Sequence, residues 1–286
     1  MDKRNIGKKI LVFLLFGMAI ALMMYPFISN YLFEHKTDST VEAIQQAAQE
    51  IDDSEQKAAI EEAKKYNQVL ANGHVTLTDP FIEDKSKDDS DNYDDLLNLN
   101  DDGVMGTVEI PGIDVSLPIY HGTSDEVLKK GAGHLKGTSL PVGGESTHAV
   151  ITGHTGLSNA KLFTDLTQVK KGDVFFLNVM GEKLAYKVDQ IKVVLPTELS
   201  DLKVVPGEDY CTLLTCTPYG VNDHRLLVRG ERTDYKEAVK EASTEKPKKA
   251  ESKWMSEYKR ALIISAIFFV VSLTVVLVVR RIREQR

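Results

Sequence analysis

Cysteine is scarce in this sequence: its 286 residues include two, Cys211 and Cys216. If both lie in one strand, their Cα atoms are about 16 Å apart, whereas a disulfide tolerates about 7 Å. Five positions is also an odd spacing, which directs the two side chains to opposite faces of the strand. A disulfide between them is therefore disfavoured, and at least one thiol is expected to be free.

Other absences narrow the function further. The sequence has no Cys-x-x-Cys or His-x-x-x-His pair, which disfavours zinc, and it has no phosphate loop or dinucleotide fingerprint. Its 35 basic and 42 acidic residues give a net charge of −7, too mild to indicate nucleic-acid binding. We therefore expect no metal, no cofactor and no nucleic-acid partner.

Two uncharged runs have the length of a membrane span, 10–28 and 261–279. Basic residues lie on the terminal side of each run: Lys3, Arg4, Lys8 and Lys9 before the first, and Arg280, Arg281, Arg283 and Arg286 after the second. The positive-inside rule then predicts two membrane passes, with both termini in the cytoplasm and the intervening chain outside the cell. A cleaved signal peptide is the alternative for the first run, but no small-residue cleavage site follows it.

The intervening chain divides by composition. Residues 1–33 are the predicted tail and anchor, and 34–73 are a helical region with a capping box at Ser39, a second start near Asp52 and a stop at Gly73. Residues 74–102 are a loop and an acidic linker, of which the acidic part, 83–102, is expected to be mobile. Residues 103–231 form a β domain, 232–258 a charged linker, 259–280 the second anchor and 281–286 a basic tail.

The β domain contains short runs rich in β-forming residues, separated by Gly and Pro turns. The runs are 104–110, 114–120, 148–153, 173–180, 183–195, 209–216 and 225–230, with short helical insertions at 124–130 and 158–166. One all-β domain of this size would hide its edges by closing into a barrel.

Cys216 is the best candidate nucleophile, because it ends an apolar run just before Thr217-Pro218, where we expect a partly exposed strand end. Cys211 is expected to be a small core residue. Among seven histidines, His154 is best placed, since it follows the apolar run 149–151 between two glycines. His134 is expected in a loop, and His224 on the face opposite Arg225. His35, His74, His121 and His148 have no distinguishing context.

These residues resemble the sortase family. Thr212-Leu213-Leu214-Thr215-Cys216 is similar to the T-L-x-T-C signature, Arg225 lies nine positions further on as the family's arginine does, and Thr152-Gly153-His154 is similar to its histidine motif. The resemblance covers about residues 104–231 and implies a closed β-barrel of about eight strands. A C-terminal apolar segment and an upstream Asp79-Pro80-Phe81 are most similar to class C, the pilus-assembling sortases of Gram-positive bacteria, in which this motif is a lid.

The resemblance implies a cysteine transpeptidase. Cys216 would attack an LPxTG-like sorting motif and form a thioester, and His154 would transfer the protons. Arg225 would stabilise the oxyanion or hold the peptide backbone. A lysine of a second pilin would resolve the thioester. A nearby cation, Arg225 or a charged His154, is expected to favour the thiolate. Asp79 is expected to pair with Arg225 while Phe81 covers the Cys216 sulfur; Asp79-Pro80 could also be an ordinary turn.

Three alternatives remain open at this point. A housekeeping-type sortase would anchor proteins to the cell wall, and a membrane-tethered cysteine protease would use the same residues with water as the acceptor. A wall-anchored adhesin would need an LPxTG-like motif before the second apolar run, and residues 240–260 have none.

Overall fold

The computed structural model describes residues 3–73, 77–81, 92–98, 102–157, 160–244 and 253–284. The chain forms two compact units. One contains residues 29–250, and the other combines 1–28 with 251–286. Every predicted site residue belongs to the first unit.

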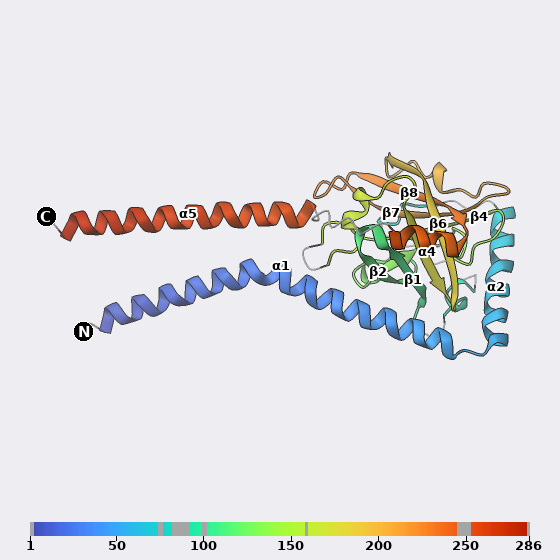
Figure 1. The fold of residues 1–286 in the computed structure, drawn as a ribbon, viewed down its shortest axis with the longest axis horizontal. Helices are drawn as coiled ribbons and strands as arrows, with labels where there is room; N and C mark the ends of the chain where they lie inside the picture. The colour runs from blue at the N-terminus through green and yellow to red at the C-terminus, as the bar shows by residue number, and fades with distance from the viewer. Residues whose placement is uncertain are drawn as a thin grey trace. The chain divides into compact units, whose positions relative to one another are not determined.

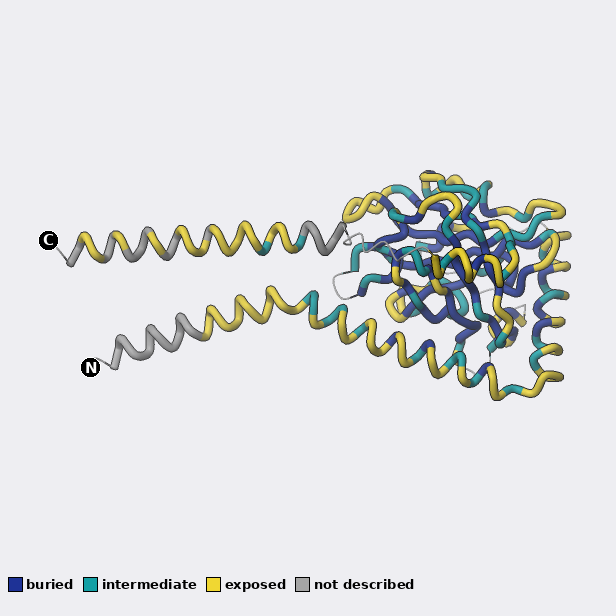
Figure 2. The backbone as a smooth tube through the Cα atoms, viewed as in Figure 1, coloured by how far each residue is buried: buried dark blue, intermediate teal, exposed yellow. Residues whose placement is uncertain are grey.

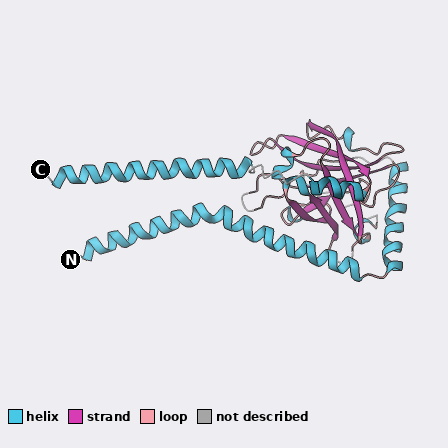
Figure 3. Cartoon of the chain, in the orientation of Figure 1, coloured by secondary structure: helices cyan, strands magenta, loops and turns pink. Residues whose placement is uncertain are grey.

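Eight strands of the first unit close into a barrel, as the sequence predicts (Figures 1 and 3). Around the barrel their order is β1-β2-β3-β4-β7-β8-β6-β5. Their bounds are β1 Val104–Ile110, β2 Val115–His121, β3 Ala132–His134, β4 Thr147–Thr152, β5 Val174–Val179, β6 Glu182–Val194, β7 Asp209–Thr217 and β8 His224–Thr233. All seven predicted runs are strands, each displaced by at most a few residues.

The eighth strand, β3, is one that no run in the sequence predicts. Its three residues pair in parallel with β2 and antiparallel with β4. Gly133 lies so close to the Gly122 carbonyl that an added Cβ would stand 2.3 Å from it. His134 therefore belongs to a strand, and the prediction of a loop there is wrong because pairing partners, rather than local sequence, define so short a strand.

Two apolar clusters occupy opposite faces of the sheet, as alternation along a strand requires. The barrel interior takes residues from all eight strands, among them Cys211, Leu213 and Val228. Figure 2 shows buried residues, in dark blue, gathered in this unit. A second set of buried apolar residues, here called the outer cluster, lies on the other face of the sheet. It includes Leu214, which is adjacent to Leu213 in β7, and Leu227, which is adjacent to Val228 in β8. The full outer cluster is Leu135, Val150, Val194, Leu202, Leu214 and Leu227.

The N-terminal helices differ in part from the prediction. Helix α1 runs from Lys3 to Glu50 without the interruption predicted at Ser39, whose hydroxyl instead donates to the Lys36 carbonyl one turn back. Helix α2 (Asp53–Asn72) begins where predicted, because Asp52 accepts a hydrogen bond from the Ser54 amide, and its C-cap is Gly73. Figure 1 shows α2 along one side of the barrel.

The segment after β8 is not a linker throughout. Strand β8 continues to Thr233, and α4 (Tyr235–Thr244) then packs Ala238 against Val174 and Phe176 of β5. Lys187 forms an ion pair with Glu241 of this helix. The charged residues of this segment form the solvated face of an amphipathic helix. The sequence prediction did not distinguish such a helix from a linker.

The two predicted helical insertions are short. Helix α3 (Asp125–Leu128) lies within the first, and a 3₁₀ turn, η3 (Thr164–Gln168), overlaps the end of the second, whose residues 158–159 lie outside the described chain. Three further 3₁₀ turns are η1 (Tyr93–Asp95), η2 (Pro111–Ile113) and η4 (Ser200–Leu202).

The structure describes only part of the loop and acidic linker predicted at 74–102. Residues 92–98 of this segment pack against the barrel. Tyr93 and Leu97 are buried to about the same degree as barrel residues, with 1% and 2% exposure. The Tyr93 hydroxyl lies 2.9 Å from His134 Nδ1 and accepts from the Gly122 amide. Residues 92–98 are therefore packed against the barrel instead of forming the predicted mobile loop, since an aromatic and two leucines offset the acidic composition.

Both apolar runs are helical, within α1 and α5 (Lys253–Glu284). Among the described residues, one helix near the N-terminus is long and apolar enough to cross a membrane. The second predicted span is not confirmed.

Candidate active site

Cys216 and Arg225 face each other across two neighbouring strands. In the antiparallel pair β7–β8 they are directly opposite partners, and Val194 of β6 is the partner of Arg225 on its other side. Cys216 shares a face with Leu214, two residues earlier, so its sulfur lies on the outer-cluster side of the sheet. Two residues that are nine positions apart in the sequence therefore lie side by side on neighbouring strands.

His154 is brought to the same end of the sheet by the parallel pairing of β4 with β7. That pairing continues past β4, because the Gly153 amide donates to the Leu214 carbonyl and the Thr215 hydroxyl donates to the Gly153 carbonyl. Glycine is required at 153, where an added Cβ would stand 2.6 Å from the Phe163 ring. The register therefore holds His154 beside the end of β7 that carries Cys216.

Asp79 forms a buried ion pair with Arg225. Nε donates to one carboxylate oxygen at 2.9 Å and a terminal nitrogen to the other at 2.5 Å, with the two side chains 7% and 3% exposed. The remaining donors of Arg225 bind the Asn222 and His224 carbonyls. The pairing expected from the sequence is present, in the bidentate geometry that a guanidinium favours.

Phe81 covers the histidine and the arginine. Its ring centroid lies 5.5 Å from that of His154 and 5.0 Å from Arg225 Cζ, and its side chain packs on the outer cluster with Leu77. The Phe81 amide also donates to the Asp79 carboxylate at 3.3 Å, which closes a local turn around Pro80. The two readings of Asp79-Pro80-Phe81 are thus combined: the motif is a turn, and the turn lies over the site.

The pKa of the Cys216 thiol is higher than the expectation of a thiolate implies. Cys216 is buried, with 8% exposure, and is not at a partly exposed strand end. Burial raises the pKa of its thiol to about 11, because Arg225 offsets only part of the desolvation and the Asp79 carboxylate adds to it. With Asp79 bound to Arg225, burial outweighs the cation and favours the neutral thiol, although Arg225 acts in the expected direction, toward the thiolate.

His154 is also favoured in its neutral form. Burial lowers the pKa of the imidazole, and the nearby carboxylate of Asp125 partly opposes this. Nε2 lies 3.7 Å from the Asp125 carboxylate and has no hydrogen-bond partner. Asp125 is a neighbour that sequence reasoning missed, because it lies 29 positions earlier and no local pattern connects it to His154.

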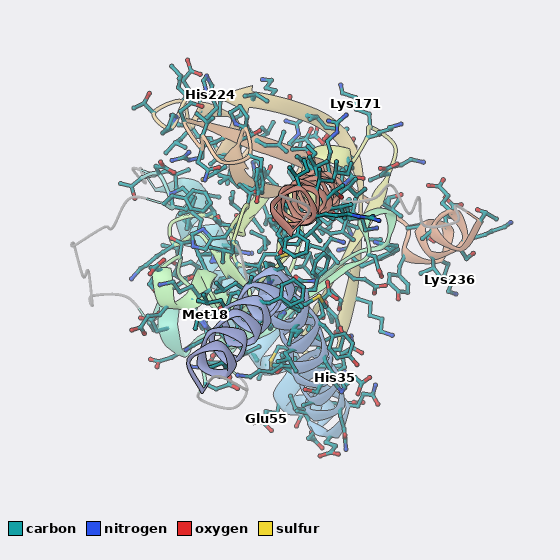
Figure 4. The ribbon with its side chains drawn as sticks, turned by 90° about the vertical axis from the view of Figure 1, so that its left-hand side faces the viewer. Met18, His35, Glu55, Lys171, His224 and Lys236 are labelled. Atoms are coloured by element: carbon teal, nitrogen blue, oxygen red, sulfur yellow. The ribbon has the colours of Figure 1, made fainter. Side chains whose placement is uncertain are left out.

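The other described histidines of the barrel do not join this site. His134 and His148 are fully buried. His134 is hydrogen-bonded to the Ser139 carbonyl, and His148 to the Lys203 carbonyl and the Thr212 hydroxyl. Burial lowers the pKa of each imidazole to about 4. His224 lies at the periphery, where Figure 4 labels it, and it pairs with Asp223. His74 lies outside the described residues.

The two thiols agree with the expectation from the sequence. Cys211 and Cys216 are both free, and Cys211 lies in the barrel interior as expected. Across the described ranges, no group of three or more His, Cys, Asp and Glu side chains has the arrangement of a metal site.

Comparison with known proteins points to one family. Residues 108–233 match the sequence profile of a Sortase domain. Among solved structures, sortase C1 of pilus island 1 of GBS is 48% identical with a TM-score of 0.64, over 70% of this chain and 93% of its own. Sortase C of Streptococcus pneumoniae is 44% identical with a TM-score of 0.63, over 69% and 97%.

Curated relatives are more distant. A sortase A of Streptococcus agalactiae is 31% identical over 45% of this chain and 52% of its own length. A sortase A of Bacillus anthracis is 27% identical over 81% and 96%. The match thus spans about half of the first relative and nearly all of the second.

Proposed function

The chain belongs to the sortase family, and from that membership we propose that it is a membrane-anchored cysteine transpeptidase that joins pilin subunits. The catalytic residues in this proposal are Cys216, His154 and Arg225, and the lid is Asp79, Pro80 and Phe81. The substrate is a pilin with an LPxTG-like sorting motif, and the acceptor is a lysine amine of another pilin.

One observation carries the proposal: the Asp79 carboxylate occupies the donors of Arg225 while Phe81 covers His154. A carboxylate bound there stands where the oxygen of a bound peptide carbonyl would be received. The similar solved structures include a sortase C1 of a pilus island and a sortase C studied for its pilin substrate specificity. These similarities favour pilin polymerisation over general wall anchoring.

The first half of the reaction requires the lid to leave. With Asp79 and Phe81 displaced, water and a freed Arg225 would both lower the pKa of Cys216 from about 11 toward the working range. The thiolate then attacks the threonine carbonyl carbon, Arg225 stabilises the oxyanion, and the Thr–Gly C–N bond breaks. Protonated His154 gives its proton to the departing glycine amine, leaving a thioester.

The second half reverses the proton transfers. A lysine amine attacks the thioester carbonyl, neutral His154 takes the amine proton, and the Cys216 thiolate departs. The product is an isopeptide bond between two pilins. His154 thus has to be protonated in one half-reaction and neutral in the other, which a ring with a pKa near the working pH does best.

The proposed location is the cell membrane, with the barrel outside. The apolar start of α1 supports an anchor. The run 261–279 in α5 and the basic residues at both ends of the chain support two passes with cytoplasmic termini, in contact with membrane lipid.

A three-acceptor experiment tests the function. Full-length protein in detergent micelles is incubated with an LPxTG-like peptide and either a lysine-containing pilin, a wall-peptide amine or buffer alone, and products are identified by mass spectrometry. We expect a thioester on Cys216 and preferential transfer to the pilin lysine. Transfer mainly to the wall amine would indicate a housekeeping sortase, hydrolysis alone a protease, and no thioester would refute the proposal.

A further inference from the structure

A carboxylate outside the three proposed catalytic residues faces His154. Asp125 is the first residue of α3, and its Oδ1 lies 3.7 Å from Nε2 of His154. Nε2 is buried and has no hydrogen-bond partner, although the His154 side chain as a whole is 20% exposed. A buried polar nitrogen without a partner is costly, and a small rotation toward Asp125 would supply one.

The local structure fixes where Asp125 stands. The Ser124 hydroxyl caps α3 by accepting from the Val127 amide, and Lys129 forms an ion pair with the other oxygen of the Asp125 carboxylate. One oxygen is thus held by Lys129 and the other is directed to the imidazole. The Phe81 ring lies 5.5 Å from the imidazole, centroid to centroid, and Phe81 also contacts Arg225 of the Asp79–Arg225 ion pair.

We propose that Asp125 is a positioning residue, which orients the imidazole of His154 and stabilises its protonated form during turnover. With Nε2–H directed to Asp125, Nδ1 carries the lone pair and is the atom that exchanges protons with the leaving and entering amines. This proposal rests on the proposed transpeptidase function. It adds a fourth residue whose effect passes entirely through His154.

Asp125 and Lys129 shift the pKa of His154 in opposite directions, which makes the proposal testable. Asp125 raises the pKa of His154, whereas Lys129 lowers it. Asp125→Asn should therefore reduce the imidazolium population and move the alkaline limb of the pH–rate profile to lower pH. Lys129→Gln should move the same limb to higher pH. Glu126→Gln changes an exposed carboxylate on the same helix and serves as the control, with no shift.

The measurement uses full-length protein in detergent micelles, with kcat and KM for a sorting peptide and a lysine amine from pH 5 to 9. Asp125 is exposed, so we expect Asp125→Asn to lower kcat about two- to fivefold with little change in KM. ¹⁵N NMR of labelled histidine should show Nε2 protonated in the neutral ring of the wild type, and a mixture of tautomers in Asp125→Asn.

The outcomes separate this proposal from the function itself. If the wild type forms no thioester, the transpeptidase function fails, whereas the NMR tautomer still reports on Asp125. If the wild type turns over and Asp125→Asn has the same profile and the same tautomer, the positioning role is wrong. Shifts of equal sign in Asp125→Asn and Lys129→Gln would also overturn it, since a purely structural disturbance of α3 would act in one direction.

Discussion

Two cysteines of one strand have opposite environments, and this sets their chemistry. Cys211 is fully buried in the barrel interior, where burial raises the pKa of its thiol well above the ordinary value. Cys216 lies on the other face, directly opposite Arg225, which binds Asp79. Arg225 therefore favours a thiolate at Cys216, whereas burial and the Asp209 carboxylate both disfavour one at Cys211.

Replacing each cysteine by alanine should separate these roles. Cys216→Ala should abolish thioester formation and polymerisation with the fold intact. Cys211→Ala should keep most activity and lose about 1 kcal/mol of stability, because it truncates one small core side chain. Mass spectrometry of the acyl-enzyme and thermal unfolding measure both. An inactive Cys211→Ala beside an active Cys216→Ala would reverse the assignment.

Arg225 is expected to act through the arrangement of its hydrogen-bond donors as well as through its charge. Its guanidinium already binds both oxygens of a carboxylate and two backbone carbonyls. Arg225→Ala should lower kcat/KM by about 10²–10³, the usual effect of losing an oxyanion donor. Arg225→Lys should recover part of this, because an ammonium cannot reproduce the planar pair of donors. Steady-state kinetics with a sorting peptide decides, and full activity of Arg225→Lys would show that charge alone suffices.

At the scale of elements, the proposed lid of Asp79, Pro80 and Phe81 is expected to control access to the thiol. Asp79→Ala removes a carboxylate that raises the pKa of Cys216, and Phe81→Ala removes an aromatic cover over His154. Each variant should alkylate with iodoacetamide faster than wild type at pH 8, roughly tenfold if the closed state dominates. The wild-type rate should keep rising toward pH 11, since only the thiolate reacts, and the Asp79→Ala profile should lie at lower pH.

This experiment is best carried out in a Cys211→Ala background, so that one thiol remains. Asp223→Ala is a matched control, because Asp223 is an exposed carboxylate of the β7–β8 loop that pairs with His224 and not with Arg225. Equal alkylation rates in wild type and both lid variants would remove the lid role and leave Asp79-Pro80-Phe81 as a turn.

Helix α2 is joined to the barrel by one buried amide. Asn67 donates to the Leu140 carbonyl at 3.0 Å and accepts from the Leu140 amide at 2.7 Å, with 3% exposure. Asn67→Leu leaves the Leu140 amide without this partner, whereas the Leu140 carbonyl still accepts from the Val142 amide, so the free energy of unfolding should fall by about 1–3 kcal/mol. Asn72→Leu is the control, since Asn72 is exposed and bonds within its own helix. Equal melting temperatures of the two variants would contradict this account.

At the scale of the whole molecule, two buried histidines make stability depend on pH. Burial lowers the pKa of His134 and of His148 to about 4. Between pH 6.5 and 4 the unfolded chain then binds more protons than the folded one, so stability is complete above pH 6.5 and falls on acidification. The loss should reach about 2–3 kcal/mol for each histidine.

Denaturant unfolding at pH 7.5, 6, 5 and 4.5 measures this slope. His148→Gln should flatten it even if the variant is less stable at pH 7.5, because one titrating group is gone. A slope in His148→Gln as steep as in the wild type would assign the acid sensitivity to other groups.

The sequence by itself determined the barrel's strands and the chemistry of the site. Runs of β-forming residues between Gly and Pro turns indicate strands wherever a run is long enough to show them, and the types of Cys216, His154, Arg225 and Asp79 limit what they can do. Family motifs then supplied their roles, because reactive residues at fixed spacings identify a family where periodicity cannot.

Only the tertiary structure decided which residues meet and how deeply they are buried. Strand β3 exists through its pairing with β2 and β4, the Asp125–His154 approach joins residues 29 positions apart, and α4 covers β5 with residues that read as a linker. The pKa of Cys216 is raised because burial outweighs the effect of Arg225, whose guanidinium binds Asp79. Burial and charge pairing are properties of the folded surface as a whole, and no local window of sequence contains them.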